Sequence, residues 1–550
     1  MVRIPSLPLA CLLAISATCL EAEVKLLTLF SDSMVLQRDM KVPIWGTATA
    51  GEKVTVEFGG QKVEATADDQ GRWRVELAPL TATAEARDLI VRATNMVTVR
   101  NVVVGDVWLA GGQSNMDSPL SSGSAAQALP EATNSLIRFF TVKKSISAEP
   151  LPEPIGKWEP STPEVAKGFS AVAYFFAREI HASQKVPVGI LRSCWGGTPI
   201  RTWMNLSSLK QEPPISSTLA EWESALAKHN QVKSQPQLQE NYYKDMKDWE
   251  TNVEPAFKAA KKAHPQEVAK AKAAGLPPPP NPQPARMEPE VPDPIAMPSA
   301  SKRPQTPTIS YNAMIAPLVP YAIRGFLWYQ GEADVSKAHE YRTWFPRLIE
   351  GWRADWRQGD LPFLFVQLPG NGKDTEPMPT KGIPFMREAQ ASVLALPATG
   401  MAVTADIGDE ADVHPDNKIF TGTRLAAVAR EKVYGEKMIG TGPRYRSHEI
   451  QGDKVRLQFD GIGGGLMIAT PPWKPTNAPA APTDRLVGFK IGDGSSWHDA
   501  EAVIDGETVV VSSPAIHQPT AVRYGWAATP VMNLYNREGF PASPFRTDAP

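Results

Sequence analysis

The stretch Val107-Trp108-Leu109-Ala110-Gly111-Gly112-Gln113-Ser114-Asn115-Met116 decides the fold that this chain can adopt. Its first four residues are apolar without polar alternation, which predicts a strand buried on both faces. Two glycines and a polar segment end that strand. We therefore expect Ser114 in a turn at the carboxyl end of a buried strand, the edge at which open parallel sheets bind their ligands.

Similar apolar runs recur along the chain and are separated by helical patterns. They cover residues 186–191, 326–329, 363–366 and 401–403. Residues 171–180, and the stretch that carries Trp344, Leu348 and Trp352, have helical spacing. Strands that alternate with helices indicate a mostly parallel sheet with helices on both faces. The predicted fold class is therefore α/β.

Regions of β character flank this α/β domain. Apolar and polar residues alternate over residues 24 to about 105, as at Val54, Val56 and Phe58, and residues 68–71 have the pattern of a hairpin turn. The last hundred residues return to the same alternation. We assign residues 23–104 to an N-terminal β-sandwich, 105–207 and 309–439 to a discontinuous α/β domain, and 440–550 to a small C-terminal β domain.

A long insertion, residues 208–308, interrupts the α/β domain. It contains two amphipathic helical patterns, the first with Thr218 and Glu221 placed as a capping box and the second over residues 242–253. Twelve prolines within 277–307 exclude a helix there and predict an extended tether. Two interpretations stay open: a tolerated insertion without a role, or a lid or wall for the active site.

Composition and the N-terminus narrow the possible functions. A formal net charge of −2 over 550 residues argues against broad attraction to nucleic acid or anionic membranes. Residues 1–22 have the pattern of an export signal, because Arg3 precedes an apolar run shorter than the ~20 residues of a spanning helix. Their removal leaves Cys194 as the single cysteine, which excludes an internal disulfide. We expect a periplasmic or secreted protein without a membrane span.

Four polar segments follow strands of the predicted sheet and should converge at one edge. They are residues 111–116, 194–198, 330–334 and 409–414. His414 lies in a loop and is flanked by acids, so it is the expected base that removes the proton of Ser114. Asp412 lies two residues earlier, on the same side of an extended segment, and is expected to hold the imidazole.

An acyl transfer also needs hydrogen-bond donors for the oxyanion of its tetrahedral intermediate. The candidates are the backbone N–H groups of Ser114 and Gly196 and the side-chain amide of Gln330. Each signal alone is weak, and Met116 stands where the usual hydrolase elbow has its second glycine. The hypothesis of a serine esterase depends on four such segments lying together at strand ends.

With these segments in view, the sequence resembles the sialate O-acetylesterase family of SGNH-type hydrolases. The matching blocks are residues 29–38, 112–116, 195–200, 311–315, 328–332, 533–536 and 541–548. Only the insertion looks unlike the usual members. The resemblance implies an SGNH-hydrolase-like parallel sheet flanked by helices. It also implies a serine esterase of glycan degradation that removes acetyl groups from carbohydrates, first of all from O-acetylated sialic acid, without a metal or an organic cofactor.

The resemblance further implies roles for single residues. Ser114 matches the nucleophile and His414 the general base. Gly196 and Gln330 match the second and third oxyanion donors, with Gly197 as an alternative to Gly196.

Two positions depart from the family pattern. Ala411 stands three residues before the histidine, where many members have the acid; Asp412 is our choice, while Asp409, or no strong acid, stays open. Arg201 replaces an acidic residue, which puts the usual sugar contact in doubt and favours an anionic substrate. The expected substrate-binding residues are Arg201, Asn312 and Glu332.

Two rival functions stay open. One is an acetylxylan or other polysaccharide acetylesterase that uses the same machinery. The other is a non-catalytic glycan-binding protein, against which the intact Ser114 and His414 argue. The expected partner is an acetylated sugar or glycan, and the sequence gives no oligomeric state.

Overall fold

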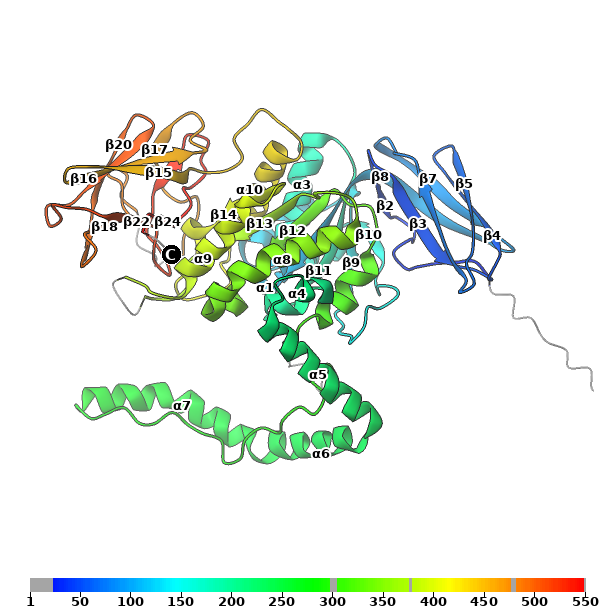
Figure 1. Cartoon of the computed structure of the whole chain (residues 1–550), viewed down its shortest axis with the longest axis horizontal. Coiled ribbons are helices and arrows are strands. Elements are labelled where there is room, and N and C mark those ends of the chain that lie inside the picture. Colours follow the sequence, from blue (N-terminus) through cyan, green and yellow to red (C-terminus); the bar gives the residue numbers. More distant parts are fainter. Residues whose placement is uncertain (1–22, 297–303, 375–377, 476–480, 549–550) are drawn as a thin grey trace, which may run out of the picture.

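The computed structural model describes residues 23–296, 304–374, 378–475 and 481–548, so the expected export signal lies outside the described residues. The N-terminal β domain, the central α/β domain and the C-terminal β domain lie in a row, and a helical arm projects below them (Figure 1). Among the described residues, no helix combines the length and the apolar character needed to cross a membrane.

The central sheet is built from the apolar runs. Its strands lie in the order β10-β9-β11-β8-β12-β13-β14; all neighbours from β9 to β14 are parallel, and β10 pairs antiparallel with β9 at the edge. The strands are β8 (Met96–Gly112), β9 (Asn134–Thr141), β10 (Trp158–Ser161), β11 (Val188–Cys194), β12 (Gly325–Tyr329), β13 (Phe363–Gln367) and β14 (Thr399–Val403). The predicted α/β architecture with a mostly parallel sheet is confirmed.

Helices cover both faces of this sheet. They are α1 (Ser114–Asp117), α2 (Pro163–Lys167), α3 (Ala171–Gln184), α4 (Leu206–Lys210), α8 (Ala338–Trp356), α9 (Ile383–Ser392) and α10 (Ile419–Lys432). Helices α3 and α10 pack together on one face, and α8 and α9 pack together on the other (Figure 1). The hydroxyl of Ser170 caps α3 by accepting the N–H of Ala173 at 3.1 Å.

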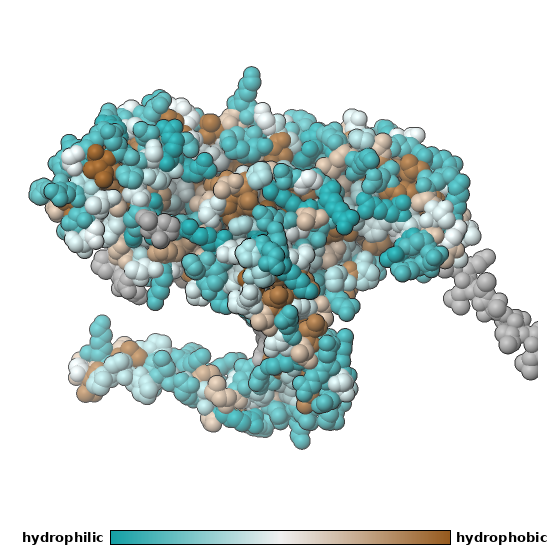
Figure 2. Space-filling view, viewed as in Figure 1, coloured by the Kyte–Doolittle hydropathy of each residue, from teal (hydrophilic) through white to brown (hydrophobic). Residues whose placement is uncertain are grey.

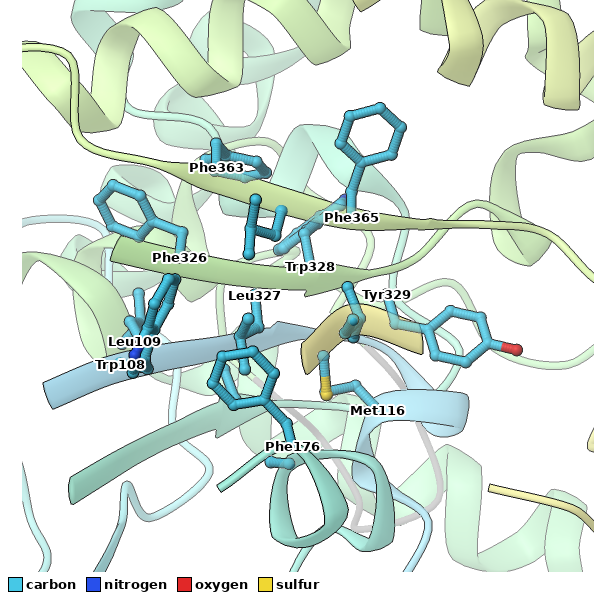
Figure 3. Packing of buried hydrophobic residues seen from close by; sticks show 14 of the residues in the cluster. Trp108, Leu109, Met116, Phe176, Phe326, Leu327, Trp328, Tyr329, Phe363 and Phe365 are labelled. Atoms are coloured by element: carbon cyan, nitrogen blue, oxygen red, sulfur yellow. The ribbon is translucent and has the colours of Figure 1, made fainter. Parts of the chain in front are cut away.

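Aromatic side chains fix the central strands against α8. Trp328 of β12 meets Trp352 of α8 edge to face, with ring centroids 5.6 Å apart, and Phe326 meets Trp356 in the same way at 5.1 Å. Figure 3 shows the rings of Phe326 and Trp328 on β12 beside those of Phe363 and Phe365 on β13. Each fully buried ring of this size contributes about 2 kcal/mol. This packing makes the carboxyl ends of β8 and β12 a rigid base for the segments that follow them.

Strand β8 crosses the expected domain boundary at 104/105. Its first half pairs with β2 (Val35–Gln37) and β7 (Thr83–Arg92) of the N-terminal domain, and its second half lies in the central sheet. Asp106, fully buried at this junction, accepts hydrogen bonds from Arg38 at 2.9 Å and Arg324 at 3.0 Å. The N-terminal domain is therefore continuous with the central sheet through one strand.

The expected hairpin at residues 68–71 is wrong. These residues connect β5 (Gln61–Thr66), which pairs with β4 (Lys53–Phe58), to β6 (Arg72–Leu77), which pairs with β3 (Val42–Thr47) in another sheet. That other sheet is completed by β1 (Lys25–Leu26). Strand β5 contains few apolar residues, so the sequence pattern did not predict it. The turn was therefore expected to join β4 directly to β6.

The C-terminal domain consists of small sheets. Its strands are β15 (Arg444–Gln451), β16 (Lys454–Asp460), β17 (Leu466–Ile468), β18 (Phe489–Gly492), β19 (Trp497–Asp499), β20 (Glu501–Asp505), β21 (Thr508–Ser512), β22 (Ala521–Tyr524), β23 (Leu534–Asn536) and β24 (Phe545–Arg546). The hydroxyl of Tyr535 donates to Asp406 at 2.7 Å, and Asp406 also pairs with Arg424 of α10 at 2.6 Å. This buried cluster attaches the domain beside the segment that leads to His414.

The helical arm comprises α5 (Ser216–Ser234), α6 (Gln237–Asn252), α7 (Glu254–Ala273) and the returning chain to residue 296. Helix α7 was not predicted from the sequence; it has no buried residue, and the visible surface of the arm is mostly hydrophilic (Figure 2). The returning chain is no free tether, because Trp249 Nε1 donates to the carbonyl of Arg286 at 3.0 Å.

The expected capping box in the arm is also wrong. Helix α5 begins at Ser216, two residues before Thr218, and shows no side-chain cap. The hydroxyl of Thr218 instead accepts the indole N–H of Trp344 at 3.1 Å. The buried indole of Trp344 needs a hydrogen-bond acceptor, and Thr218 supplies it instead of capping α5. This contact attaches the base of the arm to α8.

Candidate functional site

The structure brings Ser114 and His414 into direct contact. Ser114 is the first residue of α1, immediately after β8, and its Oγ lies 2.8 Å from His414 Nε2. Gly112 makes the turn possible: its φ is +134°, and a Cβ there would come within 2.1 Å of the Tyr329 carbonyl oxygen. A hydroxyl in hydrogen-bond contact with an imidazole nitrogen is the geometry that general-base activation requires.

Asp412 has a loose relationship with the imidazole. Its carboxylate lies 3.5 Å from His414 Nδ1 and accepts the backbone N–H of His414 at 2.8 Å. Both side chains are exposed, by 59 % for Asp412 and 48 % for His414. Asp409, the alternative acid, instead accepts the N–H of Ala411 at 2.8 Å. Of the two acids, Asp412 is the one placed beside His414. Because both side chains are exposed, water weakens the interaction between this carboxylate and the imidazole.

Gly196 lies against the nucleophile. A Cβ at this position would stand 3.1 Å from Ser114 Cβ, and the preceding Trp195 donates its N–H to the Gly112 carbonyl at 3.0 Å. The chain after β11 is thus held close to the turn after β8. The absence of a side chain at Gly196 leaves room for a small substrate group beside Ser114.

Gln330, the expected third oxyanion donor, uses its side-chain N–H groups within the protein, which argues against that role. Its side chain is fully buried, and its Nε2 donates to Asp334 at 2.7 Å and to the Thr198 carbonyl at 3.2 Å. The physical reason is the buried Asp334 carboxylate, which needs donors and also takes the N–H of Ile200 at 2.7 Å. Burial raises the pKa of Asp334, against the effect of these bonds.

Gln113 was missed in the sequence although it stands beside the nucleophile. Its Oε1 accepts the backbone N–H groups of Ala333 at 3.1 Å and Gly331 at 3.4 Å. Its Nε2 makes no hydrogen bond to the residues that the structure describes. The two bonds to Oε1 fix the orientation of the carboxamide in the residue that precedes Ser114.

Two expected substrate-binding residues have partners within the protein. Arg201 has a side chain only 12 % exposed and pairs with Glu221 of α5 at 3.3 Å. Asn312 donates to the carbonyls of Ser147 at 3.2 Å and Ala148 at 2.8 Å. Arg201 therefore connects the segment after Gly196 to the base of the arm, while α6 and α7 project away (Figure 1).

The third, Glu332, belongs to a buried polar network. Its Oε1 accepts from Asn115 Nδ2 at 2.5 Å, while its Oε2 is buried without a hydrogen-bond partner among the described residues. Burial raises the pKa of Glu332, against the Asn115 bond and the charge of Lys418. Lys418 is 3 % exposed, and burial lowers its pKa to about 8.

A metal centre has no candidate ligands here. No group of three or more histidine, cysteine, aspartate or glutamate side chains in the described part of the chain is arranged to hold an ion.

The comparison with protein families decides the relationship. The family model described as "Carbohydrate esterase, sialic acid-specific acetylesterase" matches residues 104–254 and 303–430. This chain belongs to that family. The matched ranges contain Ser114, Gly196 and His414, and the family relationship makes the protein a carboxylic ester hydrolase that acts on O-acetyl esters.

Individual relatives agree with this family. Sialate O-acetylesterase from Rattus norvegicus is 28 % identical over 474 residues, which cover 78 % of this chain and 77 % of the relative. The human sialate O-acetylesterase is 26 % identical over 470 residues, 78 % of this chain and 75 % of the relative. A carbohydrate acetylesterase from Xanthomonas citri superimposes with a TM-score of 0.74 at 34 % identity, covering 96 % of this chain and 100 % of that one.

Proposed function

We propose that this family member hydrolyses acetyl esters of a carbohydrate by a serine mechanism, and that its substrate is O-acetylated sialic acid. The single observation that carries the mechanism is the 2.8 Å contact between Ser114 Oγ and His414 Nε2. The substrate class is supported by the names of the family and of its curated relatives.

The reaction begins when His414 Nε2 takes the proton of the Ser114 hydroxyl and Oγ attacks the acetyl carbonyl carbon. The tetrahedral intermediate collapses, the sugar alkoxide takes the proton back from the imidazolium, and the sugar alcohol leaves. His414 then activates a water, which attacks the acetyl-serine and releases acetate. Every proton in this cycle passes through one nitrogen of His414.

The oxyanion needs donors beside Ser114, and we assign the backbone N–H groups of Ser114 and Gly196 to this role. Ser114 follows the end of β8 and Gly196 follows the end of β11, which is the arrangement that we expect for an SGNH-type hydrolase. Gln113 Nε2 replaces Gln330 as the third donor, because its carboxamide is already oriented by Gly331 and Ala333. One such donor contributes about 3 kcal/mol to transition-state stabilisation.

The rival acetylxylan esterase differs in substrate and shares the site. Arg201 was the residue that favoured an anionic sugar, and its pairing with Glu221 removes that argument. The preference for sialate therefore depends on the family relationship alone, and the substrate screen must include both sugars.

The test is an acetate-release assay on O-acetylated sialic acid, acetylated xylo-oligosaccharides and 4-nitrophenyl acetate, with Ser114→Ala as the matched control. We expect release from the acetylated sialic acid that Ser114→Ala abolishes. Release from the xylo-oligosaccharides alone selects the rival substrate. Equal release by Ser114→Ala contradicts the serine mechanism.

We also propose that residues 1–22 are removed during export. The support is the short positive start and the apolar run of that segment. N-terminal sequencing of the protein recovered from cell fractions tests this: a mature start near residue 23 outside the cytoplasm supports export, and an intact Met1 contradicts it.

A further inference from the structure

The carbonyl groups on both sides of His414 are held by buried side chains. Asn115 Nδ2 donates to the carbonyl of Val413 at 2.9 Å. Lys418 Nζ donates to the carbonyl of Pro415 at 2.6 Å. The residues before and after His414 are therefore both attached, through their carbonyl groups, to buried side chains of the α/β domain.

Asn115 and Lys418 are also bonded to each other and to Glu332. Lys418 Nζ donates to Asn115 Oδ1 at 2.6 Å, and Asn115 Nδ2 donates to Glu332 Oε1 at 2.5 Å. Asn115 thus uses its oxygen and both of its amide hydrogens. We call these three residues the clamp; it joins the nucleophile turn, the segment after β12 and the start of α10.

The path of the chain shows why a clamp is needed. His414 follows β14, but Ser114 follows β8, and β12 and β13 lie between these two strands. The loop must therefore reach across about 14 Å, three strand spacings, to place the imidazole on the hydroxyl. Residues 408–418 contain no helix or strand of their own. The local bonds that Asp409 and Asp412 accept from the N–H groups of Ala411 and His414 do not attach the loop to β8 or β12.

Asp412 is poorly suited to hold the imidazole alone. In a serine triad the acid orients the imidazole and stabilises its charged form. Here the acid is more than half exposed, and 3.5 Å separates it from Nδ1. Water screens such a contact strongly.

We propose that Asn115, Glu332 and Lys418 position His414 on Ser114 through the backbone on either side of the imidazole, and so take over part of the role that the acid has in other serine esterases. The inference rests on the proposed serine mechanism. These residues do not touch the reacting atoms, so they are positioning residues.

Burial of the two charges supports a specific role. An ion pair in the interior is a poor source of stability, since desolvation offsets much of the attraction between the charges. Glu332 and Lys418 do not touch each other directly; Asn115 stands between them and directs both toward the His414 loop. A network kept only for charge balance would not need contacts with both carbonyls that flank the base.

Lys418→Met tests the proposal, because it removes Nζ while keeping most of the side-chain length. We expect kcat on 4-nitrophenyl acetate to fall by about 10²-fold with little change in KM, because a small displacement of the base misaligns proton transfer. The rate of covalent inactivation by a fluorophosphonate should fall in parallel, since it needs the same serine and histidine geometry. Lys432→Met, on the exposed end of α10, is the control and should leave both rates unchanged.

A double variant separates positioning from charge balance. Glu332→Gln/Lys418→Met removes both charges, so a network that serves only charge balance would regain the wild-type rates. We expect the rates to stay low, because the Pro415 carbonyl still lacks its donor. Asn115→Ser leaves both charges in place, removes the bond to Val413, and gives the same test if Lys418→Met does not fold; we expect at least a tenfold loss of kcat.

Ser114→Ala distinguishes failure of this inference from failure of the proposed function. Wild-type kcat and inactivation rates in folded Lys418→Met and Asn115→Ser, together with an inactive Ser114→Ala, overturn the clamp alone. Full activity in Ser114→Ala overturns the serine mechanism itself, and the clamp with it.

Discussion

The imidazole Nε2 of His414 lies 2.8 Å from the hydroxyl of Ser114, although 300 residues separate the two in the sequence. The strands that precede these two residues, β8 and β14, are not neighbours in the sheet. The contact exists because one loop crosses the carboxyl ends of β12 and β13 to reach β8. The activity of this family member therefore depends on how that loop is held, as well as on the two residues that meet.

The acid of the triad should matter less than in a typical serine hydrolase. We predict that Asp412→Asn lowers kcat by about tenfold, because its carboxylate is exposed and 3.5 Å from Nδ1. Steady-state kinetics on 4-nitrophenyl acetate measure this. Asp409→Asn is the matched control and should change kcat less. A loss of about 10⁴-fold in Asp412→Asn, the size seen when a buried triad acid is altered, would contradict our description.

Gly196 should not tolerate even one methyl group. A Cβ at this position would stand 3.1 Å from Ser114 Cβ, so the loop or the serine must shift. We predict that Gly196→Ala lowers kcat by about 10²-fold, through loss of an oxyanion donor from its proper place. Gly168→Ala is the control, because a Cβ there meets nothing within 4 Å. Equal kcat values for the two variants would show that Gly196 is no part of the oxyanion site.

The two glutamines of the site should give opposite results. Gln113→Glu replaces Nε2 by an oxygen and keeps an acceptor for the N–H groups of Gly331 and Ala333, and we expect a kcat loss of about 10²-fold with little loss of stability. Gln330→Met removes the donor to buried Asp334, and we expect a stability loss of about 1–3 kcal/mol by chemical denaturation. A catalytic defect without destabilisation in Gln330→Met would restore it as the third donor.

Activity should decline on the alkaline side as Lys418 loses its proton. Burial lowers the pKa of this ammonium to about 8, while Glu332, Asp412 and Asp416 act in the opposite direction. Above that pH the clamp loses its positive charge, so kcat should fall. Lys418→Arg keeps a charge at all these pH values and should move the decline to higher pH. A pH–rate profile with the same alkaline limb in both proteins would exclude Lys418 as its origin.

The contribution of Lys418 to the stability of the fold should increase with pH, whereas its contribution to activity should decrease. Its pKa in the folded protein, about 8, is below its ordinary value of 10.5. Between these two values the unfolded chain binds more protons at this site than the folded protein does. The contribution of Lys418 to the free energy of unfolding therefore rises with pH across that window. Denaturant titrations of wild type and Lys418→Met between pH 8 and 10 measure the difference.

The sheet and the nucleophile turn were predictable because their signals are local. Uninterrupted apolar runs mark strands such as β8 and β12, and a glycine-rich polar segment marks the point where each strand ends. Strand β5 failed this criterion, because Val63 and Ala65 alternate with charged or polar neighbours and neither is fully buried. The turn at 68–71 is present where it was expected, but the strands that it joins were assigned wrongly as a consequence.

The partners of polar side chains were not predictable, because they come from distant segments. The sequence indicates that Gln330 is a free donor, but in the fold its side-chain amide donates to Asp334 and to the carbonyl of Thr198. No pattern in the sequence singles out Lys418, and only the fold places it on Asn115. A residue type in a motif shows which chemistry is possible, and the competing partners decide whether the group is free to perform it.

The most direct test of the central claim is the mass of the enzyme during turnover. Wild-type protein is mixed with O-acetylated sialic acid, quenched with acid in the first turnovers, and digested for peptide mapping by mass spectrometry. We predict one acetyl group on the peptide that contains Ser114, and an accumulation of this species in His414→Ala supplied with a reactive aryl acetate. Acetate release by wild type with no acetyl group on Ser114, or at the same rate in Ser114→Ala, would contradict the account.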